Sequence, residues 1–484
     1  MVKRLKNHVS SVLKSVSAML NHMFITQASI EATDIIKDAI VSINNVVKEN
    51  SIIKIGENFT CLLENPVENK EQLHKTLESY ILAIESIPTT QKVVFIAEFS
   101  SRWDALESVY LAFQKDAMFE TEVIVVPVTL RDEKGEITLI HGDTDYLTPL
   151  SIPHTPYDRY SFKEDTPDIV FFCLPYDWDR PPEYHLKNIR AHSLYMVYIP
   201  YAALVHRFDE RKNFKDSEVM RGSLLALSHV DAFIATGDGM VEDIEYVTGD
   251  KTKLVPLGSP KVDFLVSKRS SNNWTHYPNL EEKIKDKTTF FLNTHFRQGV
   301  LCDNNFYEFF ETLINYFSRD TKIALIWRPH PNTFTYVGAY GKKYSEKLLS
   351  LMKKMDNCNN IAIDTTPNHV AAFLYSHAVI SHLSSIISLS VALNKPTFVL
   401  DSYSKEREEN PQPHPLTNLP CYGSNQYPQD DSLVTQFIEN TKNNIDTHAE
   451  KRALLCKYLF NNIDGTCGQK IYEYVKNEVA KCKE

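Results

Sequence analysis

Residues 378–400 read AVISHLSSIISLSVALNKPTFVL, and this stretch decides the expected fold. A short apolar run at 378–380 is followed by a polar turn, a longer apolar run at 386–393 and a second β-rich run at 397–400. Strands that alternate with helices in this order are typical of parallel strands joined by crossover helices. The stretch therefore predicts one strand–helix–strand unit of an open α/β sheet.

Similar short apolar runs occur upstream of this unit, and all the runs together form two series. The first series comprises 93–97, 122–128, 169–174, 195–199, 232–235 and 254–257. The second comprises 289–293, 323–327, 361–363, 378–380 and 397–400. A polar stretch at 267–279 separates the two series. We therefore expect an α/β protein with two open sheets.

The first 86 residues lack such runs and show helical periodicity instead. Residues 1–30 contain four basic residues and no acidic one, and apolar residues recur at helical spacing from Leu13 to Met23. This basic, amphipathic helix could lie on anionic lipid, but packing on its own domain or on a partner subunit is the favoured alternative. The expected organisation is a helical appendage over 1–86, an N-terminal α/β domain over 87–270, a C-terminal α/β domain over 280–430 and closing helices over 431–484.

The composition excludes several classes of protein. The chain has 484 residues, of which 43% are hydrophobic and 24% charged, a balance typical of soluble globular proteins. Its formal net charge of -10 is spread along the chain, so nucleic-acid binding is not expected. Neither a G-x-G-x-x-G nor a G-x-x-x-x-G-K-[ST] motif occurs, so the classical glycine-rich phosphate loops are excluded. The eight cysteines lie far apart and lack the spacing of a zinc site, so we expect them to be reduced thiols. No run of 18 apolar residues exists, so we expect the protein to stay on the cytoplasmic side.

Two polar elements directly follow expected strands of the second series. The run Arg328-Pro329-His330-Pro331 follows 323–327, so two prolines hold a guanidinium and an imidazole at a strand end. Ser384 and Ser385 stand at the start of the helix expected after the strand 378–380. Backbone N–H groups and the helix dipole favour an anion there. A serine at a helix start is usually only a cap. Because ligands of open α/β sheets lie beyond the carboxyl ends of strands, the two elements together predict a phosphate site.

The ordered motifs of this region resemble those of the CDP-glycerol glycerophosphotransferase family, whose members build teichoic acid and related capsular polymers. The resemblance covers roughly residues 250–402. It rests on the segments 258–263, 294–297, 328–331, 364, 381–385 and 394–396. Capsule transferases that use CMP-sugars, such as bacterial polysialyltransferases, also carry a His-Pro motif followed by a Ser-Ser motif. The resemblance implies two Rossmann-like domains of the glycosyltransferase-B type and a cytidine nucleotide donor.

The resemblance also implies roles for the polar residues. The implied contacts to the donor phosphates are His330, Ser384, Ser385, Arg297 and Arg328. Asp364 is expected near the nucleotide, and His382, which stands where the family often has Asp, is expected in the same donor site. Fixed hydrogen-bond donors would stabilise a departing nucleotide without a metal, so no cofactor and no essential metal are expected.

The N-terminal half departs from the family pattern. Where the family usually has Trp-His-Gly-Thr with a basic histidine, residues 198–202 read Tyr-Ile-Pro-Tyr-Ala. Candidate replacements for the catalytic base are Glu98 and Asp104 after the first strand, or Asp177 and Asp179. Capping of the next helix is an alternative role for Asp104.

Two short acidic segments, 143–145 and 177–179, formally match the D-x-D pattern of metal-dependent sugar transferases. Two acidic residues in a loop arise easily by chance, and no cluster of further ligands accompanies them. We therefore interpret them as solvated loop carboxylates and not as a metal site.

These patterns predict a transferase that moves a glycerol-phosphate-type group from a CDP-activated donor to a hydroxyl of a cell-surface polysaccharide or teichoic-acid-like polymer. The alternatives are a CMP-sugar-dependent capsule glycosyltransferase of sialyl or Kdo type and a non-catalytic capsule-assembly scaffold. Expected partners are a cytidine nucleotide donor, a polysaccharide or lipid-linked acceptor and a second copy of the chain, but no nucleic acid. The expected location is cytoplasmic, with peripheral contact to the inner face of the membrane through residues 1–30 as an option.

Overall fold

The protein is described from a computed structural model. The described residues exclude 1–2, 27–29, 48, 88, 99, 132–136, 142–151, 203–217, 272–276, 296–303, 331–332, 334–341, 367, 383, 403–418, 423–431 and 482–484. The chain divides into two compact units, one of residues 1–93 with 114–121 and one of residues 94–113 with 122–484. Each unit is described by itself.

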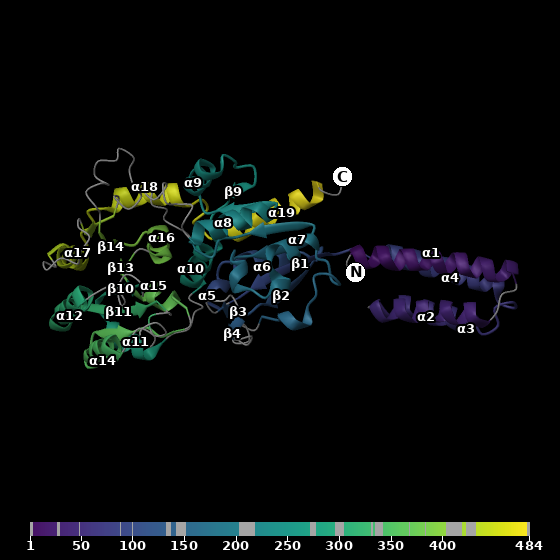
Figure 1. Ribbon diagram of the computed structural model, residues 1–484, viewed down its shortest axis with the longest axis horizontal. Coiled ribbons are helices and arrows are strands. Elements are labelled where there is room, and N and C mark those ends of the chain that lie inside the picture. Colours follow the sequence, from purple (N-terminus) through teal and green to yellow (C-terminus); the bar gives the residue numbers. More distant parts are fainter. Residues whose placement is uncertain are drawn as a thin grey trace. The chain divides into compact units, whose positions relative to one another are not determined.

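The first unit begins with four helices that pack on one another (Figure 1). They are α1 (Lys3–Thr26), α2 (Ile30–Val46), α3 (Asn50–Leu62) and α4 (Lys70–Ser86). Buried apolar residues alternate at spacings of four and three, as at Val9, Leu13, Val16 and Leu20 of α1, which is the period of coiled-coil packing. The apolar face of α1 is therefore buried among its neighbours. The expectation that this helix packs on its own domain is confirmed, and membrane contact by residues 1–30 stays a prediction.

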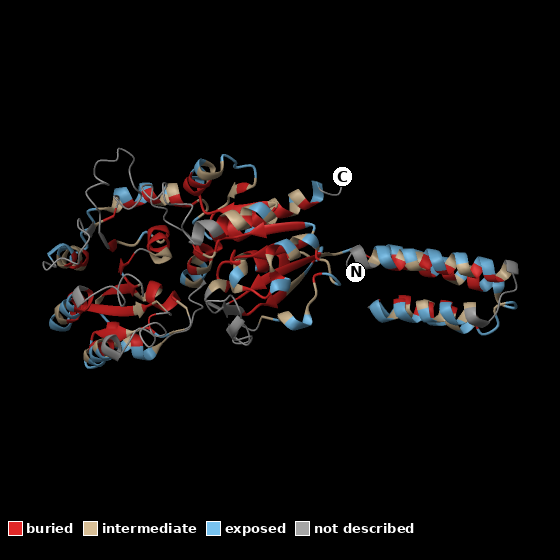
Figure 2. Cartoon of the chain, in the orientation of Figure 1, coloured by how far each residue is buried: buried red, intermediate tan, exposed pale blue. Residues whose placement is uncertain are grey.

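A seven-stranded sheet with the order β5-β2-β1-β6-β7-β8-β9 follows along the chain. Its strands are β1 (Gln91–Ala97), β2 (Phe119–Val125), β5 (Thr155–Pro156), β6 (Ile169–Phe172), β7 (Tyr195–Tyr198), β8 (Ala232–Ala235) and β9 (Leu254–Pro256). β6 and β7 pair in parallel and are buried at every residue, because helices cover both faces of such a sheet (Figure 2). All six apolar runs of the first series overlap these strands.

The bounds differ most for the predicted strand 122–128. The run 122–128 stops at Val125, and Val128 begins a separate antiparallel hairpin of β3 (Val128–Arg131) and β4 (Ile137–His141). Pro127 stands between the two strands. Because proline has no N–H for a ladder hydrogen bond, it ends the pairing of β2 with its sheet.

Helices and turns connect these strands. They are α5 (Ser100–Trp103), α6 (Glu107–Gln114), η2 (Tyr157–Arg159), η3 (Asp177–Asp179), η4 (Pro182–Tyr184), α7 (Leu186–Ala191), α8 (Glu218–His229), α9 (Asp238–Thr248) and α10 (Pro260–Ser271). Asp104 lies in the turn between α5 and α6 and so does not begin the helix that the sequence predicts after it.

The second sheet is parallel and has the order β12-β11-β10-β13-β14-β15 over the described residues. Its strands are β10 (Thr288–Thr294), β11 (Ile323–Pro329), β12 (Ile361–Ile363), β13 (Ala378–Ser381), β14 (Thr397–Ser402) and β15 (Cys421–Tyr422). Its helices are α11 (Pro278–Ile284), α12 (Asn304–Arg319), α14 (Lys342–Asp356), α15 (Val370–Tyr375) and α16 (Ser385–Ala392). The aromatic face of α12 is buried against this sheet. All five runs of the second series are confirmed as strands, so the protein has the two predicted Rossmann-like sheets.

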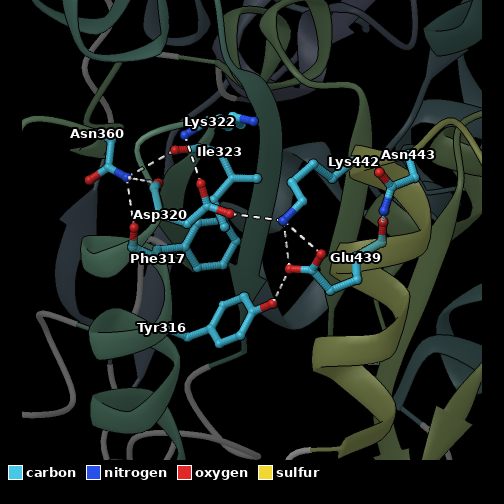
Figure 3. Close-up of polar contacts among 9 residues, drawn as sticks. All are labelled: Tyr316, Phe317, Asp320, Lys322, Ile323, Asn360, Glu439, Lys442 and Asn443. Atoms are coloured by element: carbon cyan, nitrogen blue, oxygen red, sulfur yellow. Dashed lines mark hydrogen bonds and ion pairs between the residues drawn. The ribbon is translucent and has the colours of Figure 1, made fainter.

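Three helices end the chain: α17 (Ser432–Lys442), α18 (Ala449–Leu459) and α19 (Cys467–Lys481). Figure 3 shows how α17 is attached to the second sheet, because Lys442 Nζ contacts the carboxylates of Asp320 at 2.9 Å and Glu439 at 2.8 Å. The ring of Tyr472 on α19 lies 5.0 Å from the ring of Phe113 on α6. The tail therefore closes the second sheet and also returns to the first. In the part of the chain that the structure describes, no helix combines the length and the apolar character that a membrane span requires.

Candidate functional site

The two predicted phosphate-binding elements lie at one edge of the second sheet. β10 pairs in parallel with β11 on one side and with β13 on the other. The N–H of His330, which follows β11, donates to Thr294 O at 2.9 Å, and the N–H of His382, which follows β13, donates to Asn293 O at 3.1 Å. His330 and the helix start at Ser384 and Ser385 therefore follow the strands on either side of β10, at the same carboxyl edge of the sheet.

Asn293 connects these two elements through its side chain. Its Nδ2 donates to Arg328 O at 3.1 Å, and its Oδ1 accepts hydrogen bonds from Ser381 Oγ and Ser384 Oγ, both at 3.2 Å. The residue is buried, with 7% of its surface exposed. Asn293 is not among the residues that the sequence predicts for the site. The available signal was one amide near the end of the otherwise apolar strand TTFFLNT.

Ser384 caps the helix α16. Its backbone is extended, and its Oγ accepts the N–H of Ile386 at 3.3 Å. The capping role that the sequence left open is therefore confirmed for this serine. The hydroxyl of Ser384 is already hydrogen-bonded to Asn293 and to the N–H of Ile386. The groups suited to an anion are therefore the half-buried Ser385 and the first N–H groups of α16.

Three histidines surround the end of β10. The rings of His295 and His330 lie 5.0 Å apart, and Nδ1 of His382 accepts the N–H of His295 at 2.9 Å. A nitrogen that accepts carries no proton, so neutral His382 is protonated on Nε2. Burial, with a smaller contribution from His295, lowers the pKa of His382 to about 3. This fully buried ring positions His295, so the place predicted for His382 in the donor site is one behind His295 and not in contact with the ligand.

Arg328 and Asp364 are tied to each other at the same edge. Arg328 Nη1 lies 3.0 Å from Asp364 Oδ2 and donates to Thr366 O at 2.9 Å. Asp364 Oδ1 accepts the N–H of Thr366 at 2.9 Å. This bonding fixes the guanidinium and offsets part of its charge, so Arg328 orients the loop after β12 as well as adding positive charge. Arg297, the other predicted anion contact, lies outside the described residues.

Glu98, a predicted base, directly follows β1 and is completely buried. Its Oε1 accepts a hydrogen bond from Arg180 Nη2 at 2.8 Å, and its Oε2 accepts a weak one from Cys173 Sγ at 3.7 Å. Burial raises the pKa of Glu98, and the charges of Arg180 and Arg102 offset part of that rise. The carboxylate is one half of an interior ion pair. A role as general base, which requires contact with an acceptor hydroxyl, does not fit this position.

Asp104 has a different environment. Lys261 Nζ donates to its Oδ1 at 2.6 Å, and His369 Nε2 lies 3.6 Å from its Oδ2. Burial raises the pKa of Asp104 despite Lys261, and burial also lowers the pKa of His369 well below its usual value. His369 precedes α15 at the end of the loop that follows β12, so this contact joins loops that follow strands of the two sheets. His369 could not be singled out from the sequence, because only the fold brings it to Asp104.

Of the two acidic loop segments, only the one with Asp177 and Asp179 lies among the described residues. Asp177 Oδ1 accepts the N–H of Leu186 at 2.9 Å and so fixes the start of α7. Asp143 and Asp145 lie outside the described residues. Among the residues that are described, no three His, Cys, Asp or Glu side chains are grouped so that they could hold a metal ion.

Comparison with known proteins defines the fold. No protein-family model matches the sequence, and no curated protein matches it. The S. aureus MnaA–UDP co-structure is similar over 82% of this chain and 98% of its own, with a TM-score of 0.54 and 16% identity. UDP-GlcNAc 2-epimerase from Neisseria meningitidis, bound to UDP-GlcNAc, is similar over 80% of this chain and 100% of its own, with a TM-score of 0.53 and 13% identity.

A variant of the wall teichoic acid polymerase TagF is similar over 90% of this chain and all of its own, with a TM-score of 0.50 and 12% identity. The two parallel sheets with their helices therefore form a fold of the glycosyltransferase-B type. These neighbours include enzymes that act on or bind nucleotide-activated sugars, and at such identities they establish the fold alone.

Proposed function

We propose that the protein is a CDP-glycerol glycerophosphotransferase-like enzyme. It transfers a glycerol-phosphate-type group from a CDP-activated donor to a hydroxyl of a cell-surface polysaccharide or teichoic-acid-like polymer. The observation that carries the proposal is the common edge on which His330 and the start of α16 flank β10 and are joined by Asn293. The fold likeness to TagF supports the same class of reaction.

The chemistry follows from these groups. The acceptor oxygen forms a bond to the phosphorus next to glycerol, the bond from that phosphorus to the bridging oxygen breaks, and CMP leaves with the electron pair. His330 and the N–H groups of α16 stabilise the charge that develops on the departing phosphate. Asp104 accepts the proton of the acceptor hydroxyl, because its Oδ2, unlike both oxygens of Glu98, accepts no hydrogen bond from the described residues. No metal is required for these steps, so activity is expected to survive EDTA.

The direct test is incubation of the purified protein with CDP-glycerol and hydroxyl acceptors, with release of CMP followed by chromatography. Parallel reactions contain CMP-sialic acid, CMP-Kdo or UDP-GlcNAc. We expect CMP from CDP-glycerol and no epimerisation of UDP-GlcNAc. Turnover of a CMP-sugar alone would favour the glycosyltransferase alternative, epimerisation would favour the activity named for the similar structure from Neisseria meningitidis, and no turnover of any donor would favour a scaffold.

Two variants assign the roles. His330→Ala is expected to weaken CDP binding roughly 10- to 100-fold, the effect of losing one hydrogen bond to a charged group. Asp104→Asn is expected to abolish transfer while CDP binding stays within about twofold of wild type. The matched control is His229→Ala on α8, because the ring of His229 contacts Leu225 O of its own helix at 3.0 Å. Equal effects of His330→Ala and His229→Ala would contradict the proposed site.

A further inference from the structure

An aromatic platform lies at the carboxyl edge of the first sheet, where β1, β6 and β7 are neighbours. It consists of Tyr176 and Trp178, which follow β6, and Tyr201, which follows β7. The rings of Tyr176 and Trp178 are 5.0 Å apart and inclined by 31°, and the hydroxyls of Tyr176 and Tyr201 are 3.3 Å apart. The guanidinium carbon of Arg102 lies 4.9 Å from the centre of the Tyr201 ring. The platform therefore presents aromatic faces, phenol hydroxyls and a cation together.

Three contacts hold the platform in place. Asp177 Oδ1 accepts the N–H of Leu186, which fixes the turn that carries Trp178. Arg180, fully buried, donates to Leu174 O at the start of the same loop. Gly222 on α8 leaves space for Tyr176, because a Cβ at this position would lie 2.4 Å from the tyrosine ring. The rings are thus arranged before any ligand arrives, which reduces the entropic cost of binding.

The exposure of the platform is graded. Tyr176 is 5% exposed and forms its base, while Trp178 is 37% exposed at its top. Large aromatic side chains that only stabilise a core are normally buried, and an exposed one next to hydroxyls and a guanidinium is typical of a binding surface. The position agrees with the rule that ligands of open α/β sheets lie beyond the carboxyl ends of strands.

The chemistry of the platform selects one class of ligand. An indole face packs against the C–H face of a sugar or an alditol, and phenol groups hydrogen-bond its hydroxyls. Arg102 favours an anionic group, for which a guanidinium offers several donors. The carboxylates of Asp177 and Asp179 flank Trp178, so a bare polyanion without an apolar face is disfavoured there.

We propose that this platform binds the acceptor as a polyol or sugar chain that carries phosphodiester groups, with carbon atoms against Trp178 and an anionic group at Arg102. The identification of this chain as the acceptor rests on the proposed function, whereas its binding does not.

The test uses the full-length protein labelled with 5-fluorotryptophan. The chain has four tryptophans, of which Trp103 and Trp327 are buried, and Trp178→Phe identifies the fluorine signal of Trp178. The probes are a synthetic glycerol phosphate trimer, the uncharged glycan maltotriose and inorganic tripolyphosphate. We expect the trimer to shift the Trp178 signal saturably and the other two probes to bind at least about tenfold more weakly.

Variants separate binding from folding. Trp178→Ala and Arg102→Gln are expected to weaken trimer binding about tenfold or more, with CDP affinity close to wild type. The urea midpoint should stay close to wild type for Trp178→Ala and fall for Arg102→Gln, because the charge of Arg102 also acts on buried Glu98. The control is Tyr246→Ala, which removes a 64% exposed aromatic side chain on α9 and is expected to leave trimer binding unchanged. A Trp178 signal that no probe moves, or equal binding of trimer and maltotriose, would overturn the proposal.

The outcomes also separate this inference from the proposed function. Trimer binding without turnover of CDP-glycerol would remove the proposed transferase and leave the platform as a site for phosphodiester-bearing chains. Turnover of CDP-glycerol with an unchanged acceptor KM in Trp178→Ala would keep the transferase and remove the platform.

Discussion

The carboxyl edges of the two sheets consist of different kinds of side chain. The edge of the second sheet consists of short polar side chains bonded to the backbone, with Asn293 and Ser384 at its centre. The edge of the first sheet consists of aromatic rings above the buried ion pair of Glu98 and Arg180. The comparison teaches that the residues after the strands, and not the strand–helix scaffold, decide which ligand each edge suits: an anion in our proposal for the second sheet and an extended chain in our proposal for the first.

The largest expected effect concerns the ion pair under the first edge. Arg180→Leu leaves the carboxylate of Glu98 buried without its partner, and we expect a loss of about 3 to 5 kcal/mol in the free energy of unfolding. Urea denaturation measures it. The double variant Arg180→Leu with Glu98→Leu is expected to recover most of the loss. A single variant as stable as wild type would show that the pair does not support this edge.

The next effect concerns the amide that joins the second edge. Asn293→Ala leaves Arg328 O and two serine hydroxyls without their partner, and about 2 kcal/mol of stability and about tenfold in CDP affinity should be lost. The matched control is Asn360→Ala. Asn360 Nδ2 donates to three carbonyls, Phe317 O, Asp320 O and Ile323 O, at the opposite ends of the strands (Figure 3).

Asn360→Ala should therefore lower stability by a similar amount and leave CDP affinity unchanged. Calorimetric titration with CDP distinguishes the two variants. An equal loss of affinity in both would mean that the amide at position 293 acts through general stability and not through the site.

The stability of the second edge should depend on pH through His382. His382 takes up a proton near pH 6.5 in the unfolded chain but only near pH 3 in the folded chain. The unfolded chain therefore binds more protons between these values, so the stability from neutral His382 is present above pH 6.5 and is lost as the pH falls toward 3. The slope is at most about 1.4 kcal/mol per pH unit.

His382→Asn retains an acceptor for the N–H of His295 but cannot take up a proton in this range. Urea midpoints measured from pH 7 to pH 4 should fall less steeply for this variant than for wild type. Identical slopes would indicate that the imidazole is not held neutral.

The smallest effect concerns the cap of α16. Ser384→Ala is expected to cost about 1 kcal/mol in the free energy of unfolding, and Ser384→Gly only a few tenths. Both variants should reduce CDP affinity modestly, since the helix start loses its order. A Ser384→Ala variant with unchanged stability and affinity would separate this serine from the edge network.

The strands were predictable because residues buried on both faces of a parallel sheet form continuous apolar runs, and the polar residues after β11 and β13 were predictable as strand-end residues. The contacts of Asn293 with Ser384 and of Asp104 with His369 were not. They depend on which strands become neighbours, and β10 pairs with β13 across more than eighty residues. The burial of Glu98 was missed for the same reason, because its partner Arg180 lies 82 residues away.

The proposed function requires that a nucleoside diphosphate bind between His330 and the start of α16. A crystal structure of the protein with CDP tests it most directly. We expect the distal phosphate of CDP within hydrogen-bond distance of the His330 imidazole and of a backbone N–H in the first turn of α16. A CDP molecule held elsewhere, with these groups free of phosphate, would contradict the account.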